Sequence, residues 1–199
     1  MERARPALLR RGLRLEYATL GWNVAGVLVL AVAAVRAGSV ALAGFGIDSA
    51  IEILASVVVV RELLGDADPV RERVALRRIG AAFFALAAYV SAQAVVVLAT
   101  GSHPDSSPLG IGWTAATAGV MLALAAGKAL TGRSLGHAVL RTEARVTLVD
   151  AYLASAVLAG LVLNTAAGWW WADPLAGFVV VVYGIREGLA ARRAAAAVP

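Results

Sequence analysis

The chain has no cysteine, and charged residues make up only 16% of its 199 residues. Disulfides and thiolate metal ligands are therefore excluded. Soluble domains are about 25% charged and about 45–50% apolar, whereas this chain is 60% hydrophobic. The apolar residues come in long blocks, which indicates a polytopic membrane protein. The net charge of +5 does not indicate a nucleic-acid partner, because the arginines flank the apolar blocks.

The apolar blocks predict an all-α bundle of six transmembrane helices in a single domain, residues 1–199. The spans are expected at about 17–35, 40–61, 79–100, 109–130, 140–164 and 173–191. We interpret the first block as a membrane helix rather than a cleaved signal peptide. Residues 61–78 and the segment that holds Lys128 are expected to be charged connections. Small residues in the last span, Gly177, Gly184 and Gly188, favour close helix packing.

The basic residues are distributed unevenly between the two ends of the predicted helices. Of the 18 lysines and arginines, 17 lie at the N-terminus, after the second span, after the fourth span or at the C-terminus. Only Arg36 lies in a connection on the other side. The positive-inside rule then predicts a multi-pass protein of the cell (inner) membrane with both termini in the cytoplasm.

The second span carries two acids, Asp48 and Glu52, one helical turn apart. Both project from one face, with Cβ atoms roughly 5–6 Å apart. Each acid costs about 2.5–3.5 kcal/mol at the centre of a membrane helix, and such acids usually face a bundle interior or a water-filled path. The pair therefore indicates a cation or proton site. The alternative is that the acids snorkel or bond neighbouring helices.

The fifth span brings a third acid, Asp150, to a similar depth. It lies about nine residues, or roughly 14 Å, from the expected start of its helix, and Asp48 lies equally far from the other membrane face. Glu143 is two turns before Asp150 on nearly the same face, where it can receive an ion first. Grouped carboxylates repel one another, and either a divalent metal or protons relieve that repulsion, which is the basis of metal/proton exchange. A carboxyl hydrogen bond that merely joins the two helices is the other interpretation.

Three segments together resemble the cation diffusion facilitator family. GSVALAGFGIDSAIEILAS (residues 38–56) resembles the family's second helix, LRTEARVTLVDAYLAS (140–155) its fifth, and WADPLAGFVVVVYGIREG (171–188) its sixth. The resemblance covers about residues 15–190. It implies a proton-coupled exporter of divalent metals, not an enzyme, with six helices and a transport path enclosed by helices one, two, four and five.

The resemblance also implies the ligands of the transported metal. Asp48 and Glu52 match the helix-two pair, and Asp150 matches the second member of the helix-five pair. The first member falls on Val146, so water, Glu143 or another polar group would complete the site. Oxygen ligands favour harder ions such as manganese over zinc, with iron and cobalt also compatible. The metal is cargo, and no resident cofactor is expected.

Further expectations concern assembly and the remaining polar residues. Only a few residues follow helix six, so the cytoplasmic domain that many family members carry there is not expected. The family suggests a homodimer, and here it is expected to form through the membrane helices. Glu16 is expected at the membrane interface, and Asn23 is expected to bond a neighbouring helix or line the path. Asp173 is expected to cap the last helix. The other polar and aromatic residues are expected in solvated loops (His103, Asp105), in solvent or headgroups (His137), or in an interfacial anchor (Trp169, Trp170, Trp171).

Two other classes of membrane protein are alternatives to the exporter. A membrane enzyme, such as a lipid-headgroup transferase or an intramembrane aspartyl protease, would need a longer acid cluster with glycine and arginine, or a Gly-x-Gly-Asp-like loop, and the sequence has neither. A non-transporting membrane scaffold would use its acids for helix packing alone. Metal-dependent thermal stabilisation that is lost on mutation of Glu52 distinguishes a site from a scaffold.

Overall fold

A computed structural model describes residues 5–64, 69–136 and 138–197. Within these ranges the chain forms six α-helices and no strand, as expected for an all-α bundle. The helices are α1 (Arg5–Ala37), α2 (Val40–Leu63), α3 (Pro69–Thr100), α4 (Pro108–Leu135), α5 (Ala138–Ala167) and α6 (Ala172–Ala197). Each is long and apolar enough to cross a bilayer, so the chain is a multi-pass membrane protein.

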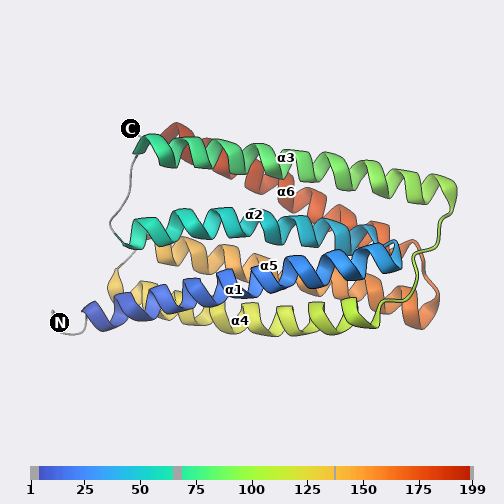
Figure 1. Cartoon of the computed structure of the whole chain (residues 1–199), viewed down its shortest axis with the longest axis horizontal. Helices are drawn as coiled ribbons and strands as arrows, with labels where there is room; N and C mark the ends of the chain where they lie inside the picture. The colour runs from blue at the N-terminus through green and yellow to red at the C-terminus, as the bar shows by residue number, and fades with distance from the viewer. Residues whose placement is uncertain (1–4, 65–68, 137, 198–199) are drawn as a thin grey trace.

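The helices lie side by side along the long axis of the molecule, and α1 begins at the same end of the bundle at which α6 ends (Figure 1). α1 packs on α2 and α4, α4 packs on α5, and α5 packs on α2. These four helices therefore form a closed ring. α3 and α6 pack along each other and join the ring through α2 and α5. These are the four helices that the family resemblance predicts around a transport path, and the path itself stays a prediction.

The helices are longer than the predicted spans, and one expected connection is largely helical. Residues 61–78 were expected to be a charged connection, but α3 already begins at Pro69. Proline suits the first helical position, and arginine, glutamate and leucine are good helix formers. The prediction failed because hydropathy reports the apolar part of a helix, whereas the backbone continues through polar residues beyond it. Asp66 and Asp68 lie outside the described residues.

The observed ends of several helices coincide with residues that favour helix termination or capping. Glycines with positive φ directly follow α1, α3, α4 and α5, at Gly38, Gly101, Gly136 and Gly168. Gly136 has φ of +64°, and its N–H donates to the carbonyl of Arg133. That left-handed conformation is strained for residues with a Cβ atom. At the start of α4, the Ser107 side chain accepts a hydrogen bond from the Gly110 N–H at 3.1 Å.

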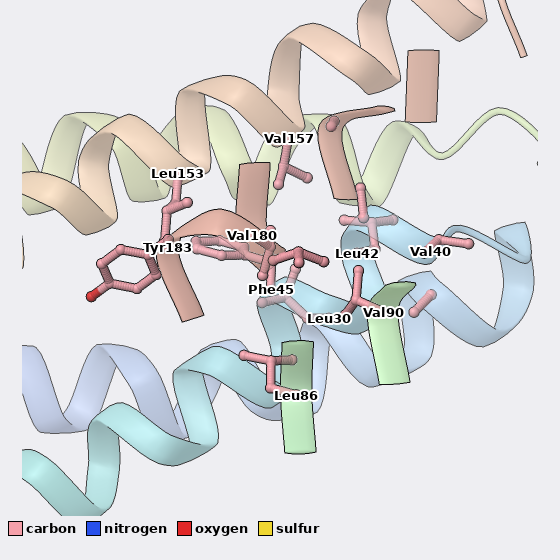
Figure 2. Close-up of a cluster of buried hydrophobic side chains, with 14 of the residues drawn as sticks. Leu30, Val40, Leu42, Phe45, Leu86, Val90, Leu153, Val157, Val180 and Tyr183 are labelled. Carbon is pink, nitrogen blue, oxygen red and sulfur yellow. The ribbon is translucent and has the colours of Figure 1, made fainter. Parts of the chain in front are cut away.

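The apolar core lies where α2, α3, α5 and α6 meet, around Phe45, Val90, Val157 and Val180 (Figure 2). Close approach of α3 and α6 depends on small residues. A Cβ atom at Gly188 would lie 3.2 Å from the Gly80 carbonyl oxygen. The prediction that glycines of the last span serve close packing is thus confirmed.

Asp173 corrects one prediction about helix capping. It lies at the start of α6 but binds the start of α2 instead. Its carboxylate accepts hydrogen bonds from the Ser39 hydroxyl and from the backbone N–H groups of Val40, at 2.9 Å, and Ala41, at 3.4 Å. The first N–H groups of a helix lack partners within it and carry partial positive charge, which attracts a buried carboxylate. Asp173 therefore attaches the start of α6 to the N-terminal end of α2, the helix that carries Asp48.

Candidate cation site

Buried polar side chains follow one face of each helix in the four-helix ring. They fall at helical spacing on α1 (Glu16, Thr19, Asn23), α2 (Asp48, Ser49, Glu52, Ser56), α4 (Thr114, Thr117, Lys128, Thr131) and α5 (Glu143, Thr147, Asp150). In contrast, no buried polar side chain is found on the described part of α3. Polar groups inside a membrane protein are costly unless they bond one another or line a path. The polar interior of the molecule is therefore the inside of the ring.

The three predicted acids lie inside this ring. Asp48, Glu52 and Asp150 are 1%, 2% and 4% exposed. Glu52 and Asp150 repel each other electrostatically, as do Asp48 and Glu52. One oxygen of Asp48 and one of Asp150 have no hydrogen-bond partner among the described residues. Two buried carboxylates with unused acceptor atoms are able to bind protons or a cation.

The acids are close without forming a closed set of metal ligands. Among the described residues, no group of three or more Asp, Glu or His side chains is arranged to hold a metal ion. Each of the three acids nevertheless interacts electrostatically with at least one of the others. In this conformation the ring contains a group of separate buried carboxylates.

A second cluster is built around Lys128, the only lysine of the chain. Its ammonium nitrogen lies 3.0 Å from Glu16 Oε2, 3.3 Å from Glu143 Oε1 and 3.0 Å from Thr147 Oγ1. The side chains of Lys128 and Glu16 are fully buried, and that of Glu143 is 8% exposed. The cluster joins α1, α4 and α5 through charge-assisted hydrogen bonds.

This cluster corrects the expected positions of Glu16 and Lys128, and it shows that Glu143 has an ion-pair partner. Glu16 was expected at the membrane interface and Lys128 in a basic connection, yet both are completely buried. Glu143, expected to receive an ion, is paired with Lys128. The error for Glu16 and Lys128 arose because each lies near the polar end of its apolar block, where sequence alone does not separate snorkelling from ion pairing. Arg145, by contrast, is exposed.

Sequence analysis missed two further groups near the acids, Tyr183 and Glu187 on α6. Tyr183 is 6% exposed, and its hydroxyl has no hydrogen-bond partner among the described residues. Figure 2 shows it at the edge of the apolar cluster with the hydroxyl directed away from the labelled side chains. Glu52 and Asp150 are its main electrostatic neighbours. A tyrosine in an apolar stretch is an ordinary core residue by sequence, and only the fold places it beside acids.

The remaining polar and aromatic residues of interest are distributed as follows. Asn23 is buried inside the ring, and its Nδ2 has no partner among the residues described. His103 is exposed in the loop after α3, as expected, and its ring stacks on Trp170 with centroids 4.9 Å apart. Trp169 and Trp171 stack on each other and are partly exposed, in keeping with an interfacial anchor. His137 lies outside the described residues.

Comparison with known proteins does not identify the chain. No protein-family model matches it, and no curated protein matches it either. The resemblance to cation diffusion facilitators therefore stays a prediction that rests on the three segments in which it was found.

Proposed function

We propose that the protein exports a divalent transition-metal ion from the cytoplasm in exchange for protons, with Asp48, Glu52 and Asp150 as the ion-binding groups. The observation that carries the proposal is three fully buried carboxylates on α2 and α5 inside a ring of membrane-length helices. Acids are kept at such a position, against an insertion cost of about 2.5–3.5 kcal/mol each, where they serve an ion or proton path.

The chemistry of the site supports exchange. A metal binds carboxylates only in their deprotonated form, so metal binding releases protons and protonation releases the metal. The acids are separate in this conformation, and ion binding would draw α2 and α5 together around the cation. Because all the donors are oxygens, we favour manganese, with iron and cobalt next, over zinc.

The proposed orientation places both termini in the cytoplasm of the cell (inner) membrane. The burial of Lys128 removes it from the basic residues near that face, which leaves 16 arginines of the original 17 basic residues. Arg36 stays alone near the other face. The asymmetry that the positive-inside rule uses is thus preserved.

Transport by purified protein in proteoliposomes tests the proposal. Asp150→Asn removes one negative charge and keeps the side-chain volume, so we expect Mn²⁺ uptake to fall to the level of empty vesicles while the protein stays folded. Asp105→Asn changes an exposed acid and should leave uptake unchanged. Full activity of Asp150→Asn would remove this residue from the site.

Metal binding in detergent separates a transporter from a scaffold that uses its acids for packing. Saturable Mn²⁺ binding with simultaneous proton release is expected for the wild type and should be lost in Glu52→Gln. If the wild type binds none of Mn²⁺, Fe²⁺, Co²⁺, Zn²⁺ and Mg²⁺, the acids have only a packing role. Dimerisation through the membrane helices is measured on the same samples by light scattering.

A further inference from the structure

The Lys128 cluster contains more carboxylate than its single ammonium satisfies. Glu16 and Glu143 supply two negative charges when both are deprotonated, and Lys128 supplies one positive charge. Glu16 Oε1 is buried and has no hydrogen-bond partner among the described residues. Burying an uncompensated charge in a membrane protein is costly. The cluster therefore retains unused capacity for a cation.

The oxygens around the ammonium have the composition of a metal site. Two carboxylates and the Thr147 hydroxyl approach one point from α1 and α5, each within 3.3 Å of the Lys128 nitrogen. The Thr147 hydroxyl donates to the Glu143 carbonyl oxygen at 2.9 Å, which leaves its lone pairs directed at the ammonium. Hard divalent cations such as Mn²⁺ and Mg²⁺ prefer such oxygen ligands.

We propose that Glu16, Glu143 and Thr147 form a second cation-binding position, which Lys128 occupies as a tethered cation in this conformation. A divalent ion and the ammonium cannot share the position, because like charges repel and the same oxygens serve both. Lys128 therefore closes this position, and an ion enters only when the lysine side chain leaves.

The location of the cluster gives this position a role in transport, and that role rests on the proposed function. Glu143, Thr147 and Asp150 follow one another along the buried face of α5. α5 begins at the end of the bundle where α1 begins and α6 ends (Figure 1), and Glu143 and Thr147 precede Asp150 along α5. Lys128 attracts both Glu52 and Asp150 electrostatically. An ion travelling between that end and the three acids thus meets the lysine first, and Lys128 acts as the gate on that side.

The test uses a background in which all three main acids are neutral, Asp48→Asn with Glu52→Gln and Asp150→Asn, so that its outcome does not depend on transport. We expect this triple variant to bind no Mn²⁺. Adding Lys128→Ala removes the ammonium, leaves space, and should restore binding of about one Mn²⁺ per chain. Adding Glu16→Gln to that variant should abolish the restored binding. Lys128→Arg keeps the positive charge and serves as the matched control, with no Mn²⁺ bound.

The outcomes distinguish the two proposals. Restored binding supports the second position even if the wild type transports no metal, and a folded Lys128→Ala variant that binds no Mn²⁺ overturns it even if the wild type transports well. If Lys128→Ala unfolds in detergent, it is purified with excess MnCl₂. If Mn²⁺ yields monodisperse Lys128→Ala protein, but does not do so once Glu16→Gln is added, the second cation-binding position is supported. If Mn²⁺ does not restore folding of Lys128→Ala, the result counts against that position.

Discussion

Tyr183 is a neutral group whose placement bears on how the three acids would hold an ion. The family resemblance leaves Val146 at a position usually taken by a metal ligand, and Val146 has no donor atom. The Tyr183 hydroxyl is buried on α6, has no hydrogen-bond partner among the described residues and interacts electrostatically with Glu52 and Asp150, so under the proposed function it is a candidate to complete the site. It would do so by binding the ion through oxygen or by orienting a carboxylate with a hydrogen bond.

We predict that Tyr183→Phe weakens Mn²⁺ binding by about 10-fold or more, the loss typical of groups that orient metal ligands. The substitution removes only the hydroxyl and keeps the ring in the apolar cluster, so thermal stability should change little. Tyr152→Phe is the matched control, because Tyr152 is 62% exposed on the neighbouring helix. Isothermal titration of both variants makes the comparison, and equal affinities would show that the Tyr183 hydroxyl is not involved.

Single residues were predictable from the sequence where they contrast with their surroundings. Asp48, Glu52 and Asp150 stand alone in apolar helices, and all three are buried in the ring. Lys128 and Glu16 were not predictable in the same way. Each follows or precedes other charged residues, so their burial depends on contacts between α1, α4 and α5 that no single segment encodes.

At the scale of helices, the contact between Asp173 and α2 sets the position of the acid-bearing helix. Asp48 follows the capped residue Val40 by eight positions, about 12 Å along the helix axis. A shift at this end would carry Asp48 and Glu52 with it, because a helix moves as a rigid unit. The cap thus connects the start of α6 to the geometry of the acids.

Asp173→Ala is expected to lower the free energy of unfolding by about 1–2 kcal/mol, because the first N–H groups of α2 lose their acceptor. Asp173→Asn keeps one acceptor oxygen and should lose less. Asp105→Ala, an exposed acid on the neighbouring loop, should stay within about 0.5 kcal/mol of the wild type. Reversible unfolding in mixed micelles measures all three. A wild-type stability for Asp173→Ala would mean that water replaces the cap without cost.

The existence of each helix was predictable, because an apolar block of about 20 residues has few alternatives in a membrane. The residues at which the helices begin and end were less predictable. α1 begins at Arg5, 12 residues before the expected span at Tyr17, and α3 begins at Pro69, 10 residues before the expected span at Ile79. Hydrophobicity reports the bilayer core, whereas the backbone hydrogen bonds of a helix continue through arginine-rich turns.

At the scale of the whole molecule, the four-helix ring and the pair formed by α3 and α6 contribute different parts of the interior. α3 and α6 approach each other closely at Gly80, Gly184 and Gly188, and they contribute part of the apolar core. The charged interior belongs to α1, α2, α4 and α5. Under the proposed function, a change in the packing of the ring against α3 and α6 would supply the two conformations that alternating access needs. Only the family resemblance led us to expect this grouping, because composition and hydropathy do not show which helices touch.

The orientation of the whole molecule is testable because the chain has no cysteine. Ser102→Cys and Ser134→Cys each introduce one thiol at an exposed position, in the connection after α3 and near the end of α4. The positive-inside rule places Ser102 outside and Ser134 in the cytoplasm. A membrane-impermeant maleimide should therefore label Ser102→Cys in intact cells and Ser134→Cys only after permeabilisation. The reverse pattern would place the termini outside, and the Lys128 gate would then face the outer solution and control release instead of entry.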